Sequence, residues 1–146
     1  MNNRIFVLLG LGLFVAACSD SNKGDSTKSQ GWQPQINQPS ELASIMRVLH
    51  NEATERKATL EDGYMAVVNS KLIFKMINAK PTEPHMIGQA FEPSAQAFMA
   101  SYGQLSATDD VQGQIKAHNN LVKSCVACHM NFCQGPIPRI EKLYVK

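Results

Sequence analysis

The residues with the most specific chemistry in this sequence are two thiols and an imidazole within five consecutive positions, Cys125-Val126-Ala127-Cys128-His129. On a helix, residues three and four positions apart lie on one face, so all three side chains would point in the same direction. Thiols at this spacing can form thioether bonds with the two vinyl groups on one porphyrin edge, and CxxCH is the motif that attaches haem c. A neutral imidazole is a good axial ligand for the iron. The motif predicts one covalent haem c on Cys125 and Cys128, with His129 as an iron ligand.

Other uses of this cysteine pair fit the sequence less well. A thioredoxin-like CxxC normally follows a strand in a βαβ unit, and the sequence shows no such context. A zinc ion needs four converging donors, and Cys133 would complete the set, but one stretch of helix cannot surround a tetrahedral ion. A disulfide between Cys125 and Cys128 is open to an exported protein, yet it leaves His129 without a role.

The N-terminal segment predicts export and lipidation. Arg4 precedes an apolar run over residues 5–17, which is shorter than the roughly 20 residues of a membrane-spanning helix. A basic start, a short apolar region and small residues before a cleavage point are typical of a secretory signal peptide. The run ends in the letters VAAC, which resemble the bacterial lipoprotein processing box. We therefore expect a signal peptide over residues 1–17 and acylation of Cys18. The alternative is an ordinary signal that leaves Cys18 as a free thiol.

Residues 18–39 are expected to form a flexible tether behind that lipid anchor. They are polar, rich in Gly, Ser, Asn and Gln, and nearly free of apolar side chains. Such a segment cannot bury enough surface to offset the entropy of ordering it. Ser19 rather than an aspartate follows Cys18, which in Gram-negative sorting resembles an outer-membrane address. The expected location is the periplasm, anchored to a membrane, with the outer membrane favoured over the inner.

The charge pattern argues against a nucleic-acid partner. The chain has 14 Lys and Arg, 12 Asp and Glu, and a formal net charge of +2. No basic stripe or cluster is present. The remaining histidines are His50, His85 and His118, and we expect His85 and His118 to be solvated. Cys133 has no assigned partner, so it is either a buried free thiol or the site of an intermolecular disulfide.

The elements that must position the motif are helical from residue 40 onward, because period-2 alternation is nearly absent. Ser40 predicts the N-cap of a first helix. A second helix is expected to begin between residues 57 and 63, where Thr59 and Asp62 resemble a capping box. Residues 79–91 are expected to form a loop. The inner face of the first helix would carry Leu42, Ile45, Met46, Leu49 and Ala53. That of the second would carry Leu60, Tyr64, Val67, Val68, Leu72, Ile73 and Met76.

Two further helices follow from the same periodicity. Pro93 suits the first turn of the third helix. Asp109 and Asp110 suit the positive end of the fourth helix, which Gly135 and Pro136 should end. The third helix would carry Ala95, Phe98, Met99, Tyr102 and Leu105 on one side. The fourth would carry Val111, Ile115, Val122, Cys125 and His129 on its inner face. Four amphipathic helices over residues 40–146 predict an all-α domain, an antiparallel four-helix bundle with C-terminal haem c attachment.

A single CxxCH near the end of an all-helical chain resembles the cytochrome c-prime family, the class II c-type cytochromes. The resemblance covers about residues 40–133 and is strongest over residues 123–132. It implies that Phe132 packs against the haem. The sequence departs from the family at Cys133, where an arginine is usual, and after Gly135, because the family's last helix usually ends the chain.

The resemblance also places the second axial ligand of the iron on the first helix. Met46 matches the methionine of the low-spin, electron-transferring members. An apolar side chain at that place would instead leave the iron open to NO or CO, and His50 or another methionine could serve as ligand. The expected function is a non-enzymatic electron carrier, with a gas-binding haem protein as the alternative. Redox partner proteins are not identified by the sequence, and the resemblance implies a homodimer in some members.

Overall fold

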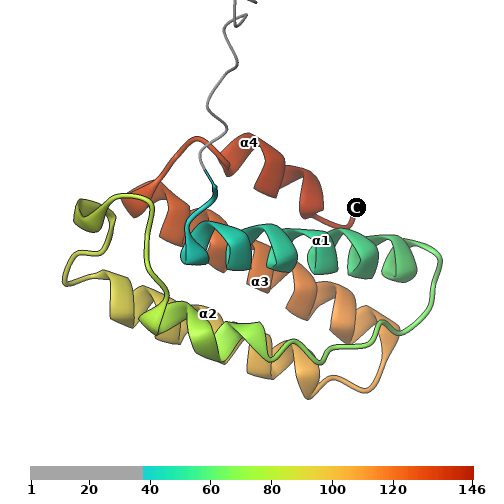
Figure 1. Cartoon of the computed structure of the whole chain (residues 1–146). Coiled ribbons are helices and arrows are strands. Elements are labelled where there is room, and N and C mark those ends of the chain that lie inside the picture. Colours follow the sequence, from blue (N-terminus) through green and yellow to red (C-terminus); the bar gives the residue numbers. More distant parts are fainter. Residues whose placement is uncertain (1–37) are drawn as a thin grey trace, which may run out of the picture. The chain divides into compact units, whose positions relative to one another are not determined.

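The computed structural model describes residues 38–146, and all the regular structure in this range is helical (Figure 1). The all-α prediction is confirmed. The expected signal peptide, the acylation of Cys18 and nearly all of the tether lie outside the described residues. The long helices are α1 (Glu41–Glu61), α2 (Phe91–Ser106) and α3 (Val111–Phe132). The short ones are η1 (Leu72–Asn78), η2 (Pro84–Met86), α4 (Ile137–Ile140) and η3 (Glu141–Leu143).

Helix α1 begins where the sequence predicts and ends later than expected. The Ser40 hydroxyl accepts a hydrogen bond from the Ala43 N–H at 3.1 Å, which confirms the N-cap. The helix then passes through Thr59, so the predicted capping box is wrong. It ends at Glu61, and Gly63 in the turn that follows has a φ of +83°, the left-handed conformation that glycine adopts without a steric penalty.

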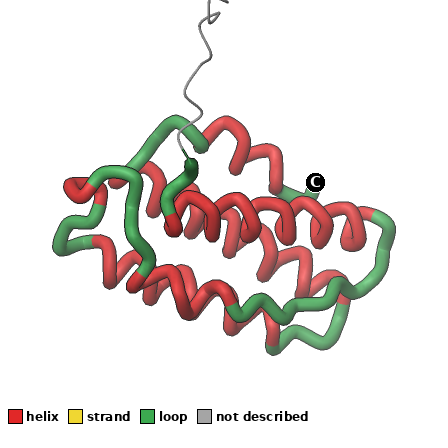
Figure 2. The backbone as a smooth tube through the Cα atoms, in the orientation of Figure 1, coloured by secondary structure: helices red, strands yellow, loops and turns green. Residues whose placement is uncertain are grey.

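The predicted second helix is wrong. Residues 64–71 form no helix, and the 3-10 helix η1 follows them (Figure 2). Val67 and Val68 are β-branched and Asn69 is a weak helix former, so local propensity does not favour a helix here. Side chains of other elements bind the backbone instead. The Gln114 amide pairs with both the N–H and the C=O of Ala66, at 2.7 and 3.0 Å. The Tyr102 hydroxyl accepts from the Ser70 N–H at 2.8 Å.

The chain reverses direction between successive long elements (Figure 1). Helix α2 packs along α3, and η1 packs against both α1 and α2. Three long helices and the segment 64–78 therefore enclose the main core. Its buried residues are Ile73, Met76, Phe91, Ala95, Phe98, Tyr102, Leu105 and Leu121. Within residues 38–146, no helix combines the length and the hydropathy needed to cross a membrane.

Helix α3 is the element that carries the CxxCH motif; its predicted start is confirmed, but it ends before Gly135, which is not its C′ residue. The Asp110 carboxylate accepts from the Gly113 N–H at 2.8 Å as the N-cap. The helix ends at Phe132, just before Gly135 and Pro136. The chain then folds back as α4 and η3, which the sequence did not predict. They pack against α1 and α3 in a second small core, which consists of Ala53, Val122, Ile140 and Leu143.

Candidate functional site

The three residues of the CxxCH motif lie on the last two turns of α3. Cys125, Cys128 and His129 are all half-buried, so the motif borders the interior without being sealed in it. Cys125 lies deepest and packs against both cores. Burial raises the pKa of Cys125 to about 12 and also raises that of Cys128. Both thiols are therefore protonated near neutral pH, unlike the low-pKa thiolates of redox-active CxxC sites.

His129 is oriented by the backbone that follows it. Its Nδ1 lies 3.1 Å from the carbonyl oxygen of Cys133. A carbonyl can only accept, so this hydrogen bond requires the proton on Nδ1 and leaves the Nε2 lone pair free. Metal-binding histidines are commonly held in this way, with the second nitrogen bound to a carbonyl. Burial lowers the pKa of His129, which favours the neutral ring that can act as a ligand.

Met46 and Phe132 contact the same core as Cys125. Both are half-buried side chains against the main core, Met46 from α1 and Phe132 from the end of α3. Phe132 meets Phe91 edge-to-face, with ring centroids 5.7 Å apart and planes at 75°. Cys133, which the sequence left unassigned, is a half-buried free thiol with its Sγ 3.3 Å from His129 Nδ1. Of the residues predicted for the cofactor, Met46, Cys125 and Phe132 thus contact one core, and Cys128 and His129 lie on the same helix as Cys125 and Phe132.

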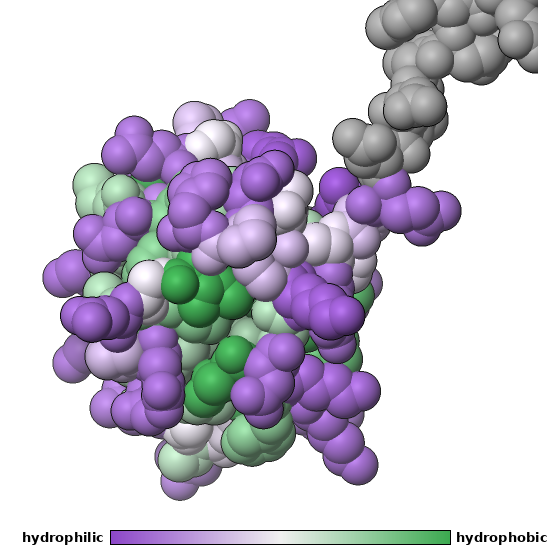
Figure 3. Space-filling model, turned by 60° about the vertical axis from the view of Figure 1, so that its left-hand side comes forward, coloured by the Kyte–Doolittle hydropathy of each residue, from purple (hydrophilic) through white to green (hydrophobic). Residues whose placement is uncertain are grey.

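The ligands that this site offers suit haem, whereas the packing around the site matches haem less closely. Haem needs only one or two protein ligands, because the porphyrin supplies four nitrogens, and His129 offers a free Nε2. Two cavities of about 410 and 360 Å³ lie along the C-terminal segment instead, and neither is lined by a residue of the motif. No group of three or more His, Cys, Asp or Glu side chains forms an ion site among residues 38–146. Figure 3 shows strongly apolar surface between hydrophilic rims at the end of the molecule where α3 finishes and α2 begins.

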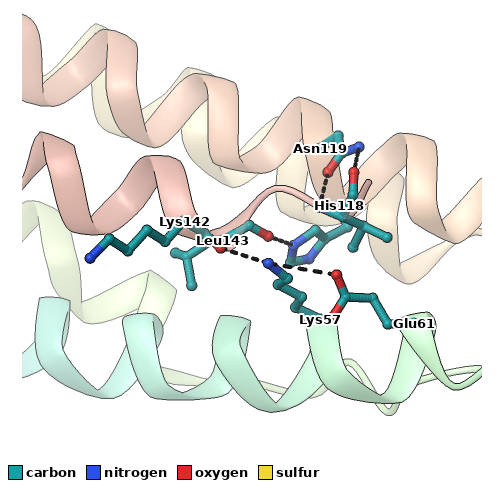
Figure 4. Close-up of polar contacts among 7 residues, drawn as sticks. Lys57, Glu61, His118, Asn119, Lys142 and Leu143 are labelled. Atoms are coloured by element: carbon teal, nitrogen blue, oxygen red, sulfur yellow. Dashed lines mark hydrogen bonds and ion pairs between the residues drawn. The ribbon is translucent and has the colours of Figure 1, made fainter.

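A buried polar cluster between α1, α3 and η3 was missed by the sequence reasoning. His118 is 0% exposed and Arg56 only 5%, so the prediction of a solvated His118 is wrong. Arg56 Nε donates to His118 Nδ1 at 3.1 Å. His118 Nε2 lies 2.8 Å from the carbonyl oxygen of Leu143 (Figure 4). His85 is exposed, as predicted. His50 is half-exposed and lines the smaller of the two cavities, away from the motif.

Further contacts hold the same C-terminal segment. The Asn119 amide donates to the carbonyl of Val145 at 3.0 Å and accepts from its N–H at 2.9 Å. Lys57 Nζ donates to the carbonyl of Lys142 at 2.8 Å (Figure 4). We call these contacts, with those of His118, the C-terminal clamp. They bind backbone groups of residues 142–145, so their role in this structure is to fix that segment.

Comparison with protein-family models, curated proteins and solved structures finds no match for this chain.

Proposed function

We propose that this protein is a membrane-tethered periplasmic monohaem c-type cytochrome that carries electrons. The observation that carries the proposal is the geometry of the CxxCH motif on α3. Cys125, Cys128 and His129 share one helix, and the Cys133 carbonyl holds His129 with its Nε2 free. In this proposal Cys125 and Cys128 hold the haem by thioethers, and His129 binds the iron. The bound haem supplies a one-electron couple; the protein sets its ligands and surroundings.

The second axial ligand in this proposal is Met46. It contacts the core that Cys125 and Phe132 also contact, and a thioether sulfur favours ferrous iron more than a second imidazole does. Phe132 would pack against the porphyrin.

The antiparallel four-helix bundle belongs to the same proposal. Helices α1, α2 and α3 would be three of its members, and the segment 64–78 would occupy the place of the fourth. Its helical part, η1, lies against both α1 and α2, as a bundle member must. The expected lipid on Cys18 and the tether over residues 18–39 would keep the domain at the outer membrane.

The second candidate is a gas-binding haem protein. Met46 is one of several half-buried residues around the main core, and methionine is a common filler of such spaces. If Met46 only packs, the iron would keep an open position for NO or CO. The state of the iron in the isolated protein separates the two functions.

The experiment that tests covalent attachment is mass spectrometry of the denatured protein, produced in a host with full haem c attachment machinery. The wild type should carry the mass of one haem. Cys128→Ser should lose it or retain it only in traces, because one thioether partner is gone. Cys133→Ser is the matched control, a nearby half-buried cysteine outside the motif, and should keep the haem. A colourless wild type from such a host would refute the proposal.

A further inference from the structure

A surface away from the CxxCH motif combines exposed apolar side chains with lysines. It lies on the segment between α1 and residue 79. Met65 is 40% exposed, Phe74 70% and Val67 81%, which is unusual for large apolar residues so close together. The surface, which we call the apolar–basic surface, consists of Tyr64, Met65, Val67, Lys71, Phe74 and Lys75.

The local backbone turns these side chains outward. In the extended stretch, Ala66, Val68 and Ser70 are at least half-buried, whereas Met65 and Val67 alternate with them and face solvent. The inner side is fixed by the Gln114 and Tyr102 hydrogen bonds to the backbone of Ala66 and Ser70. The outer residues therefore cannot rotate into the core without breaking these bonds.

Helix η1 likewise has one buried side and one exposed side. Residues three apart in a 3-10 helix lie above one another. Ile73 and Met76 form one such row and are buried. Lys71 and Phe74 form the neighbouring row, and Lys75 lies beside them; all three are exposed. The exposed side of η1 thus carries Phe74 together with Lys71 and Lys75.

The charge of this surface is positive and unneutralised. No Asp or Glu occurs between Asp62 and Glu83. Within residues 38–146 the only ion pair joins Lys57 and Glu61, so neither Lys71 nor Lys75 is in a salt bridge there. Apolar side chains flanked by free lysines fit a partner that offers hydrocarbon beneath a layer of negative charge.

We propose that the apolar–basic surface docks on an anionic lipid bilayer. Phe74 and Val67 enter the boundary between headgroups and acyl chains, and Lys71 and Lys75 contact lipid phosphates while their stems lie along the apolar region. A second copy of this chain fits less well, because a two-fold contact would bring the same lysines of both copies together. A protein partner would need a recess for each apolar side chain, whereas a bilayer accepts them without one. The inference goes beyond electron transfer and does not depend on the haem.

The test is vesicle flotation of the mature chain starting at Ser19, which lacks the acyl group and keeps every described residue. Vesicles of phosphatidylcholine with phosphatidylglycerol are compared with phosphatidylcholine alone. The chain should bind the anionic vesicles more tightly. Lys71→Gln with Lys75→Gln should weaken that binding by about fivefold per lysine. Val67→Ser with Phe74→Ser should weaken binding to anionic vesicles by about tenfold or more.

Matched control variants show whether vesicle binding depends on where on the protein a lysine or an apolar side chain is replaced. Lys116→Gln with Lys142→Gln makes the same change in charge at exposed positions elsewhere, and Val48→Ser removes an exposed valine of α1. Both should bind as the wild type does. The proposal is overturned if the wild type stays unbound, or if the control variants lose as much affinity as the surface variants. It is also overturned if sedimentation shows a dimer that the surface variants dissociate, because the occupant would then be a second copy.

Discussion

Arg56 and His118 fix one another's protonation state inside the molecule. A guanidinium N–H can only donate, so His118 Nδ1 must accept and the ring proton must be on Nε2, which donates to Leu143. The ring is therefore neutral in this arrangement. Burial lowers the pKa of His118, and the nearby charges of Arg56 and Lys57 lower it further, against the hydrogen bond to Leu143 and the charge of Glu61, which raise it.

This depressed pKa predicts that acid weakens the fold. In the unfolded chain His118 titrates near its ordinary value of about 6.5. Between that value and the lower folded pKa, the unfolded state binds more protons, so the free energy of unfolding rises with pH. The stabilisation is complete above about pH 6.5 and is lost as the pH falls toward the folded pKa. Urea midpoints should be lower at pH 5 than at pH 7.

The variant His118→Gln isolates this contribution, because His129 also has a pKa lowered by burial and titrates in the same sense. A glutamine can keep one acceptor and one donor but cannot take up the proton. The difference in urea midpoint between pH 5 and pH 7 should shrink. His85→Gln, at an exposed position, is the control and should leave the difference as in the wild type. If the urea midpoint of the His118 variant differs between pH 5 and pH 7 as much as that of the wild type, the buried contacts of His118 do not cause the difference.

Met46 decides between the two candidate functions, and a second methionine provides its control. Met46 and Met99 are both half-buried against the main core. If Met46 binds the iron, the ferric wild type should be low-spin, with the weak long-wavelength absorption band of methionine–iron ligation. Met46→Ala should convert it to a high-spin form that binds CO when reduced. Met99→Ala should stay low-spin. A wild type that is already high-spin and takes up CO would make Met46 a packing residue and favour gas binding.

At the scale of elements, the end of α1 depends on one glycine. Gly63 has a φ of +83°, and a side chain there meets no atom within 4 Å, so only the backbone conformation opposes substitution. Gly63→Ala should destabilise the protein by about 1 kcal/mol. Gly103 lies inside α2, also with open space around it. Gly103→Ala should stabilise the protein by about 0.5–1 kcal/mol. The melting temperatures of the two variants should shift in opposite directions relative to the wild type. Shifts in the same direction would contradict this account.

The sequence predicted the elements whose signals are local. Ser40 and Asp110 are caps, and their hydrogen bonds involve residues three positions away, so the starts of α1 and α3 were correct. The second helix was predicted wrongly from apolar spacing and from the resemblance of Thr59 and Asp62 to a capping box. Partners distant in sequence, Gln114 and Tyr102, bind that backbone in a different conformation. Such long-range hydrogen bonds leave no periodic signal in the segment itself.

The candidate site, too, could be predicted from the sequence only where its signals are local. The CxxCH spacing was enough to place Cys125, Cys128 and His129 on one helical face. The role of the Cys133 carbonyl depends on how α3 ends, which no spacing reveals. The burial of His118 could have been inferred, because it lies on the inner row of α3. The row consists of Val111, Ile115, His118, Val122, Cys125 and His129. The burial of Arg56 could have been found in the same way, from its place between Ala53 and Leu60 on α1.

At the scale of the whole molecule, the expected lipid on Cys18 and the apolar–basic surface predict two different kinds of membrane attachment. An acylated Cys18 should keep the wild type in the membrane fraction through a high-salt wash. The same chain from Ser19, exported behind a conventional cleavable signal, should be released by that wash, because lysine–phosphate contacts are screened by salt. Mass spectrometry of the N-terminal peptide checks the acyl group. A wild type with an unmodified N-terminus in the soluble fraction would refute the lipoprotein assignment.

The C-terminal clamp imposes an order of events on the maturing chain. Residues 142–145 are synthesised on the order of a second or more after Cys125, and Leu143 and Val145 become buried only when they reach α1 and α3. Once they dock, the sulfur of Cys125 lies between two cores. Under the proposed function, an enzyme that joins a vinyl group to that sulfur would reach it more readily while the segment is still undocked. A variant that docks faster would narrow this interval, so the same contacts that stabilise the finished protein would compete with its modification.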